Sequence, residues 1–268
     1  MLIRHIFSDM DGTLLSSSGH VSNYNVATIK DSQIPFTLVS ARAPMEMAET
    51  IDKLNLKDPQ IAFNGGLIFK KSADNLQVLR DDPLALEDIK FIIQQVKINF
   101  PSVSCSCYDV SHWYSDKNDA GIKYEASLTN QKIQVIDYDS LFNQDKKFYK
   151  IMLITFDNKE MESLNTFLLN LKITSISIKR SGKEYLEITS KKAQKSKGIK
   201  YIQDLERLLR DEMAAFGDGH NDLPMLKSVG TPIVMDNALA EIKQHGKFIT
   251  KTNDADGVAY GIKNYLKG

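Results

Sequence analysis

Residues 8–13 read Ser-Asp-Met-Asp-Gly-Thr, and they mark the end of the first predicted strand. It follows the apolar run 2–7 (LIRHIF), which is typical of a strand buried in a sheet. Ligand sites of parallel sheets lie beyond the carboxyl ends of the strands, which is where Asp9 and Asp11 stand. Two carboxylates this close repel each other unless a proton or a cation relieves them, and Mg²⁺ is the natural hard-oxygen partner. Gly12 allows a sharp turn that exposes N–H groups to an anion.

Two further apolar runs, at residues 36–39 and 61–63, predict more strands of the same kind. Segments of helical character lie between the three runs, at 22–31 and 44–55. Asn64-Gly65-Gly66 favours a turn into a hairpin. Alternation of strand and helix is the pattern of an α/β fold, a Rossmann-like parallel sheet with helices on both faces. It returns after residue 190, with strands at 213–216 and 231–235 and helices at 198–209, 221–227, 237–244 and 256–266.

The middle segment, residues 82–190, follows a different pattern. It is richer in strand-like runs of β-branched and aromatic residues, and an apolar stripe at helical spacing lies near its start. We therefore predict a sheet domain assembled from residues 1–81 and 191–268, with a separate α+β domain inserted between them. The predicted elements of the insert are strands at 103–108, 148–156, 173–178 and 185–189 and helices at 86–96, 117–128 and 161–171.

The composition is that of an ordinary globular protein, with 42% apolar and 25% charged residues. Lys and Arg together number 34, and so do Asp and Glu, which argues against a nucleic-acid binder or a protein held on an anionic membrane. The apolar runs are too short for a membrane span, and no signal peptide precedes Asp9, so we expect a cytoplasmic protein. Cys105 and Cys107 have no second Cys/His pair nearby, and we expect reduced structural thiols.

A second acidic cluster occupies residues 217–222 (Gly-Asp-Gly-His-Asn-Asp). It follows an apolar strand and precedes a helix, as the first cluster does. It therefore brings Asp218 and Asp222 to the same edge of the predicted sheet as Asp9. A lone Gly-Asp-Gly is more often a simple turn. We interpret residues 217–222 as part of a functional site because they occur together with the first acidic cluster.

Two further segments suit an anion. Ser40-Ala41-Arg42 stands at a strand end, where a hydroxyl and N–H groups at a helix start can bind a phosphate oxygen. Lys197, in the run 195–198 (Lys-Ser-Lys-Gly), lies just before a predicted helix and can neutralise phosphate and carboxylate charge together. A lysine in such a position is most often a surface residue. A functional role is favoured here because the two acidic clusters and the segment 40–42 are also present.

Taken together in chain order, the segments 8–13, 40–42, 195–198 and 217–222 resemble the motifs of the haloacid dehalogenase (HAD) superfamily. The whole chain resembles one branch of it, the Cof-type sugar-phosphatase-like hydrolases. The position of the insert implies a type C2 cap, an α/β lid that excludes water and selects the substrate. The resemblance covers essentially the full length and rests on residues 9–15, 61–66, 196–198, 217–222 and 256–259.

The resemblance implies a Mg²⁺-dependent phosphatase that hydrolyses small phosphorylated metabolites, such as sugar phosphates, through an aspartyl-phosphate. Asp9 would be the nucleophile. Asp11 would act as general acid toward the leaving alkoxide and then as the base that activates water. The resemblance also suggests a monomer or a weak dimer.

It further implies the binding groups. Mg²⁺ would be held by the Asp9 carboxylate, the Asp11 backbone carbonyl and Asp218. Asp222 would either ligate the metal directly or hold the metal's ligands in place. The phosphoryl oxygens would be bound by Ser40, Lys197, Asn221 and the N–H groups of Met10 and Ala41.

The chain departs from the family where Thr-Gly-Arg is usual and Ser40-Ala41-Arg42 stands instead. Serine keeps the hydroxyl, whereas the methyl group of Ala41 restricts close approach of the backbone. In the insert, the segment 112–114 (His-Trp-Tyr) offers either substrate contacts or buried core. Two alternatives to a phosphatase are a phosphomutase of the same fold and a phosphometabolite-binding protein without turnover.

Overall fold

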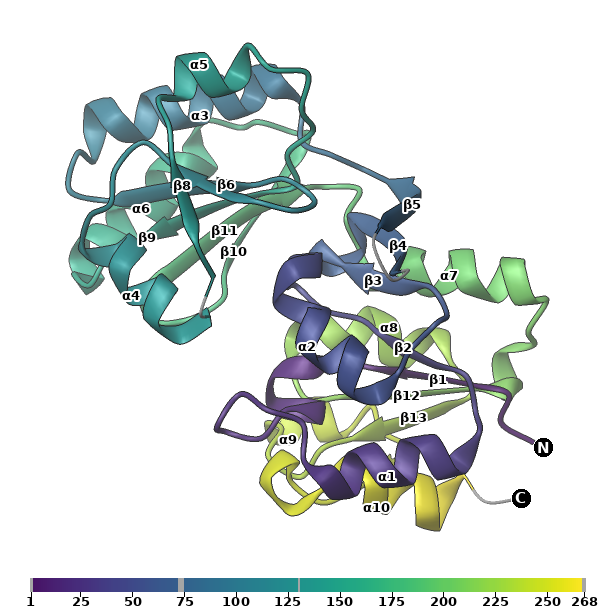
Figure 1. Ribbon diagram of the computed structural model, residues 1–268. Coiled ribbons are helices and arrows are strands. Elements are labelled where there is room, and N and C mark those ends of the chain that lie inside the picture. Colours follow the sequence, from purple (N-terminus) through teal and green to yellow (C-terminus); the bar gives the residue numbers. More distant parts are fainter. Residues whose placement is uncertain (1, 72–74, 130, 267–268) are drawn as a thin grey trace. The chain divides into compact units, whose positions relative to one another are not determined.

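The computed structural model describes residues 2–71, 75–129 and 131–266, and the chain divides into two compact units (Figure 1). The first unit comprises Met1–Arg42, Met47–Asp81 and Gln194–Gly268, and the second comprises Ala43–Glu46 and Asp82–Ala193.

Two details of this division differ from the predicted boundaries. Residues up to Ala193 group with the second unit, beyond the predicted end at 190, because the Lys191 N–H still donates to the Ser175 carbonyl at 2.8 Å. The segment Ala43–Glu46 also groups there, and the Glu46 carboxylate lies 3.7 Å from the ammonium of Lys150.

A parallel sheet with the strand order β14-β13-β12-β1-β2 forms the centre of the first unit. All of its pairings are parallel, and Ser8 at the end of β1 lies opposite Phe216 of β12. The predicted α/β fold is therefore confirmed. The strands are β1 (His5–Ser8), β2 (Phe36–Leu38), β12 (Met213–Gly217), β13 (Thr231–Val234) and β14 (Phe248–Ile249).

Helices cover both faces of this sheet (Figure 1). On one face, Phe7 and Ala215 belong to a buried cluster with Ile199 of α7 and Met225 of α8. On the other face, the ring of Phe216 lies against α10. The helices of the first unit are α1 (Asn23–Ser32), α2 (Pro44–Leu54), whose first three residues group with the second unit, α7 (Lys195–Glu206), α8 (Leu223–Ser228), α9 (Ala240–Lys243) and α10 (Gly257–Tyr265).

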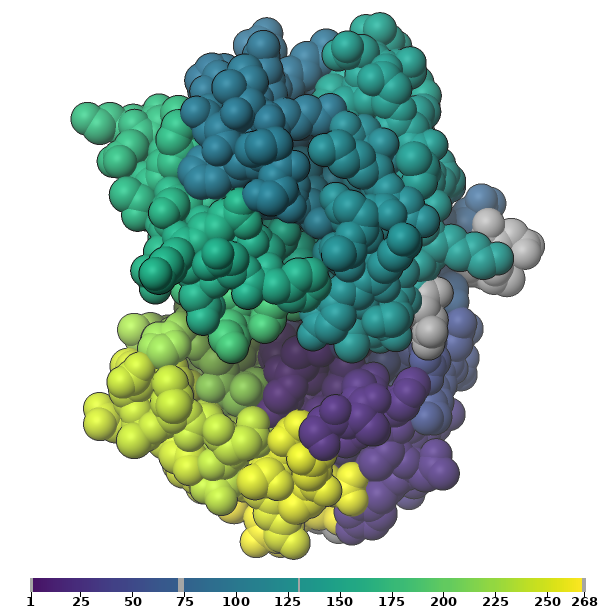
Figure 2. Space-filling view, turned by 90° about the vertical axis from the view of Figure 1, so that its left-hand side faces the viewer, coloured from purple at the N-terminus to yellow at the C-terminus, as the bar shows by residue number. Residues whose placement is uncertain are grey.

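The N-terminal and C-terminal parts of the chain pack against each other in the first unit. The Ala259 N–H of α10 donates to the side-chain oxygen of Asn25 on α1 at 2.8 Å. The purple N-terminal and yellow C-terminal segments accordingly touch in the space-filling view (Figure 2).

A small antiparallel sheet, with the order β3-β4-β5, leads from the first unit to the second. It consists of β3 (Gln60–Ala62), β4 (Leu67–Lys71) and β5 (Leu76–Asp81). The predicted hairpin at residues 64–66 joins β3 to β4, as expected. The turn is tight, because Phe63, Asn64 and Gly65 have φ values of 50°, 56° and 98°.

The second unit is a six-stranded sheet with the order β10-β11-β9-β6-β7-β8. Helices α3, α5 and α6 pack on one face, whereas Gly121 of α4 lies against Ser104 on the other. No helix within the described residues of either unit has the length and apolar character of a membrane span. The elements are β6 (Ser104–Tyr108), β7 (Trp113–Ser115), β8 (Ile133–Val135), β9 (Lys150–Ile154), β10 (Ile176–Arg180), β11 (Tyr185–Ser190), α3 (Leu86–Asn99), α4 (Ala120–Thr129), α5 (Tyr138–Phe142) and α6 (Asn158–Asn170).

Two of the three side chains in the 112–114 segment are buried. Trp113 and Tyr114 are buried, and the Tyr114 hydroxyl donates to Asp109 at 2.7 Å. The side chain of His112 is 45% exposed. Tyr114 thus belongs to the apolar core of the second unit, and Trp113 is a buried side chain that stacks on Tyr108.

Cys105 and Cys107 are free thiols buried in the same core, as predicted. Burial raises the pKa of Cys105 to about 12, and that of Cys107 well above its ordinary value. A thiol with a pKa of 12 is only about 10⁻⁴ ionised at pH 8, and the thiolate is the reactive form. We expect neither thiol to react with a disulfide reagent at pH 8 in the folded protein, and both to react after denaturation. Stoichiometric labelling that precedes unfolding would contradict this burial.

Candidate functional site

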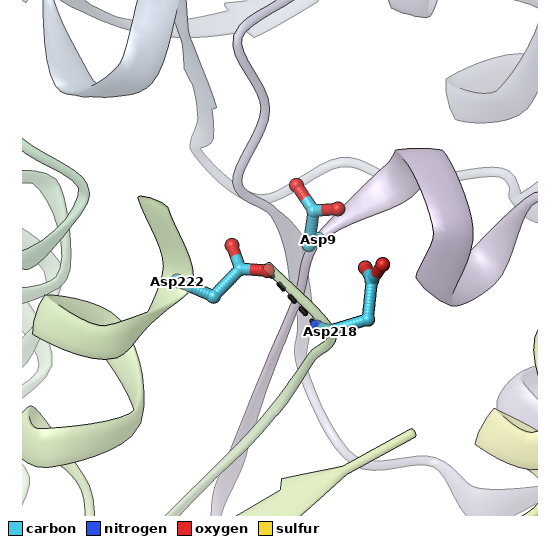
Figure 3. A group of neighbouring side chains, drawn as sticks. All are labelled: Asp9, Asp218 and Asp222. Atoms are coloured by element: carbon cyan, nitrogen blue, oxygen red, sulfur yellow. Dashed lines mark hydrogen bonds between the residues drawn. The ribbon is translucent and has the colours of Figure 1, made fainter. Parts of the chain in front are cut away.

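Three acidic side chains meet where the two central strands end (Figure 3). Asp9 follows β1, Asp218 follows β12, and Asp222 ends the helical turn His220–Asp222. Because β1 and β12 are paired in parallel, their carboxyl ends coincide. Each side chain offers a carboxylate oxygen within 4.8 Å of the others.

A buried lysine lies between two of these carboxylates. The ammonium of Lys195 donates to Oδ1 of Asp9 and, at 2.7 Å, to Oδ1 of Asp222. The side chain of Lys195 is only 1% exposed. Burial by itself would lower the pKa of Lys195, but the charges of Asp222 and Asp9 outweigh it and raise that pKa above its ordinary value. The ammonium therefore stays charged at physiological pH.

The structure corrects the predicted lysine, because Lys195 rather than Lys197 contacts the carboxylates. Helix α7 begins at Lys195, before the predicted start at 198. On a helix, Lys195 shares a face with Ile199 and Ile202, and all three are buried, whereas Lys197 is half-buried. This i, i+4, i+7 spacing is the sequence signal that could have identified Lys195.

The three acids carry more negative charge than one ammonium neutralises. Burial, and then the charge of Asp222, raise the pKa of Asp9 well above its usual value. Burial also raises the pKa of Asp218 to about 6, although the Thr13 hydroxyl, which donates to its Oδ1 at 2.7 Å, acts in the opposite direction. A set of oxygen donors with excess negative charge fits a hard divalent cation.

Asp222 holds the other groups in place. Its Oδ2 accepts the N–H groups of Asp218, at 3.0 Å, and of Gly219, at 2.9 Å, and the first of these bonds is drawn in Figure 3. Its Oδ1 accepts from Lys195. Asp222 therefore fixes both the loop that carries Asp218 and the end of the lysine. The predicted phosphate ligand Asn221 lies on the same turn and is half-buried.

Gly12 and Gly65 permit two close approaches at this edge. Gly12 has φ of 73°, and a Cβ there would lie 2.4 Å from Oδ2 of Asp218. Gly65 has φ of 98°, and a Cβ there would lie 2.2 Å from the carbonyl oxygen of Gln194, just before Lys195. Both positions demand the left-handed backbone and the missing side chain of glycine.

The other predicted phosphate ligands lie at the ends of the neighbouring strands. Ser40 is buried, its N–H donates to the Ile61 carbonyl at 2.9 Å, and its own carbonyl accepts the Asn64 N–H at 2.8 Å. Met10 is buried directly after Asp9, and Ala41 is half-buried directly after Ser40. Their roles toward phosphate stay predictions.

Asp11 does not join the group formed by Asp9, Asp218 and Asp222. Its side chain is 58% exposed and forms an ion pair with Arg42 at 2.7 Å. The sequence pattern gave no sign that Arg42 contacts Asp11, because 31 positions separate them.

Comparisons with known proteins agree with this geometry. Residues 6–262 match the haloacid dehalogenase-like hydrolase family. A Haemophilus influenzae protein named for an expected phosphatase activity is 30% identical over 97% of this chain and 97% of its own length. The 5-amino-6-(5-phospho-D-ribitylamino)uracil phosphatase YwtE of Bacillus subtilis is 28% identical, again over 97% of each chain. The crystal structure of TM0651 from Thermotoga maritima shares the fold, with a TM-score of 0.88 and 24% identity over 100% of this chain and 99% of that one.

Lys195→Met should strongly destabilise the protein in metal-free buffer, because it leaves two buried carboxylates without their cation. Breaking a buried pair costs about 3–5 kcal/mol, and we expect the lower end because Asp9 can take up a proton. Lys197→Met, the matched control, should stay within about 0.5 kcal/mol of the wild type. Urea unfolding measures both.

The loss in Lys195→Met should also depend on pH. The variant raises the folded-state pKa of Asp9 further above its unfolded value, so the folded form binds the extra proton and stability falls as pH rises. We therefore expect a smaller loss at pH 5 than at pH 8. Equal losses in the two lysine variants, or a loss that is the same at both pH values, would contradict the assignment.

Proposed function

This chain belongs to the family of haloacid dehalogenase-like hydrolases, and we propose that it is a Mg²⁺-dependent phosphatase of small phosphorylated metabolites that acts through an aspartyl-phosphate on Asp9. Within the family it is a phosphomonoesterase, as are the relatives named for phosphatase activity. The observation that carries the proposal is the buried ammonium of Lys195 between Asp9 and Asp222, beside Asp218.

Asp9 is the proposed nucleophile. A carboxylate and a phosphate ester repel each other, so attack requires cations at the site. The Lys195 ammonium touches Oδ1 of Asp9 and supplies one positive charge where the phosphoryl group would come to lie. A buried ammonium acts strongly here, because little water screens it.

The Asp9 and Asp218 carboxylates and the Asp11 backbone carbonyl are the proposed ligands of Mg²⁺. When bound, Mg²⁺ would neutralise charge on the phosphoryl oxygens. Thr13 orients Asp218 through Oδ1. Both carboxylate oxygens of Asp222 already accept hydrogen bonds, which favours a supporting position for Asp222 over direct ligation.

The remaining proposed roles are those that the family resemblance implies, with Lys195 in the place of Lys197. The Ser40 hydroxyl, Asn221, Lys195 and the N–H groups of Met10 and Ala41 would bind the phosphoryl oxygens. Asp11 would protonate the leaving oxygen and then take a proton from the attacking water.

We infer that the substrates are phosphorylated sugars, sugar alcohols or similar small metabolites. The YwtE relative is named for a substrate that carries phosphate on a ribityl chain, and such a substrate belongs in the first panel tested. Selection among these substrates by the inserted unit is the expectation from the family resemblance.

Phosphate release from 4-nitrophenyl phosphate and a metabolite panel tests the proposal. We expect release to require Mg²⁺, to stop with chelator, and to fall more than about 10³-fold in Asp9→Asn. Asp204→Asn is the matched control, because Asp204 is an exposed carboxylate of the same unit that pairs with Lys200 in the preceding turn of its helix. It should keep full activity.

Other results would redirect the assignment. Release that survives chelator and Asp9→Asn alike would exclude Asp9 as nucleophile. A folded wild type that releases phosphate from no substrate but forms a stable phosphoenzyme would favour a phosphomutase. Absence of both would favour binding without turnover.

The glycine pair offers a second test. Gly12→Ala drives a methyl group into Asp218, whereas Gly19→Ala introduces the same backbone strain, at φ of 79°, with no atom within 4 Å. Both should lose about 1–2 kcal/mol of stability from left-handed strain. Gly12→Ala alone should raise the Mg²⁺ concentration for half-maximal activity, by about tenfold or more, because a proposed ligand is displaced. Equal Mg²⁺ requirements in the two variants would argue against Asp218 as a ligand.

A further inference from the structure

Arg42 donates two parallel hydrogen bonds to the carboxylate of Asp11. Its Nε donates to Oδ2 at 2.9 Å, and a terminal guanidinium nitrogen donates to Oδ1 at 2.7 Å. A two-point contact of this kind fixes the plane of the carboxylate as well as its distance, which a single ammonium cannot do.

The backbone of Arg42 is itself fixed from both sides. Its N–H donates to the hydroxyl of Ser40 at 3.1 Å, and its carbonyl accepts the N–H of Phe63 at 3.0 Å. Ser40 and Phe63 are both buried. The guanidinium therefore projects from a rigid base at the end of β2, although its own side chain is 27% exposed.

Asp11 needs such a support more than the buried acids do. It lies in the loop Met10–Leu14 with extended backbone, at φ of −74° and ψ of 124°, and its side chain is 58% exposed. An exposed carboxylate changes rotamer freely unless another group holds it. Asp9 and Asp222, by contrast, are held by Lys195 within the protein.

We propose that Arg42 is a positioning residue that aims the Asp11 carboxyl group at the leaving oxygen, an inference that rests on the proposed function. In the first step, an oxygen of Asp9 attacks phosphorus, and the ester P–O bond breaks. Its electron pair stays on the leaving oxygen, which takes the proton of the Asp11 carboxyl group. Arg42 donates to both oxygens of Asp11, so it orients the carboxyl group before this transfer and the resulting carboxylate after it. In the second step the Asp11 carboxylate accepts a proton from water as the water oxygen attacks phosphorus and the bond to Asp9 breaks.

The leaving group provides the test. An alkoxide leaves slowly without a proton, whereas 4-nitrophenolate leaves readily without one. The ratio kcat/KM reports the steps through the first irreversible one, which includes departure of the leaving group. A defect in proton donation therefore lowers kcat/KM for an alkyl phosphate and spares 4-nitrophenyl phosphate.

We would measure both values for the wild type, Arg42→Ala and Arg42→Lys, with the best alkyl phosphate of the panel as the first substrate. Since general acid catalysis contributes about 10²–10⁴-fold, we expect Arg42→Ala to lose at least about 30-fold on the alkyl phosphate. The loss on 4-nitrophenyl phosphate should stay below about threefold, which also shows that the variant is folded. Arg42→Lys keeps the charge without the fork and should behave like Arg42→Ala.

Two further variants complete the design. In an Asp11→Asn background, Arg42→Ala should cost less than about twofold on the alkyl phosphate, because the carboxylate through which Arg42 is proposed to act is gone. Arg4→Ala, which removes an arginine paired with Glu212 at 3.3 Å in the same unit, should leave both rates unchanged.

Equal losses on the two substrates would overturn the proposal, since Arg42 would then bind the phosphoryl group or support the fold. Losses that multiply in the Asp11→Asn background would also overturn it, since Arg42 would act independently of Asp11. A wild type that hydrolyses no substrate would instead overturn the proposed function, and this inference with it.

Discussion

The buried ion cluster of Lys195 with Asp9 and Asp222 is the constraint on which the rest of the site depends. Removing a carboxylate from water is costly, and a single opposite charge offsets that cost only when the geometry is good and the remaining lone pairs are satisfied. The chain meets this condition for Asp222, whose second oxygen accepts two backbone N–H groups. This condition is not fully met for Asp9 and Asp218, and burial raises the pKa of both carboxyl groups. The remaining excess of negative charge is the physical reason to expect a cation here.

The scaffold brings these groups together with little freedom. Asp9 and Asp218 leave neighbouring parallel strands, so the register of β1 against β12 sets their separation. The turn at Gly65 packs against the residue before Lys195, which ties the start of α7 to the end of β3. Catalysis of phosphoryl transfer depends mostly on positioning and charge neutralisation, and groups on rigid elements meet that need better than groups on long loops.

Polar groups in the inserted unit show a contrasting use of the same chemistry. Asp109 accepts the N–H groups of Ser111 and His112 and the hydroxyl of Tyr114, and Lys146 donates to it at 3.3 Å. These bonds close the β6–β7 connection, and every partner comes from the same unit. An acidic residue with several donors is therefore no guide to a catalytic site by itself. The cluster at Asp9 differs because Asp9, Asp218 and Asp222 lie around a single ammonium, that of Lys195, so their negative charge exceeds the positive charge in contact with them.

The sequence by itself determined the parallel sheet, the insert as a separate pattern, and the acids Asp9, Asp218 and Asp222 at one sheet edge. Those features depend on local rules, since an apolar run followed by Asp and Gly reports a strand end wherever it occurs. Short strands such as β7, β8 and β14 escaped prediction, because each is defined by its partner rather than by its own two to three residues. The choice between Lys195 and Lys197 became clear in the tertiary structure, where the packed start of α7 turns Lys195 inward, although the spacing of Lys195 to Ile199 and Ile202 was a usable sequence signal. Tertiary structure alone decided that Arg42 meets Asp11, since two side chains on different strand ends can pair only after the sheet brings those ends together.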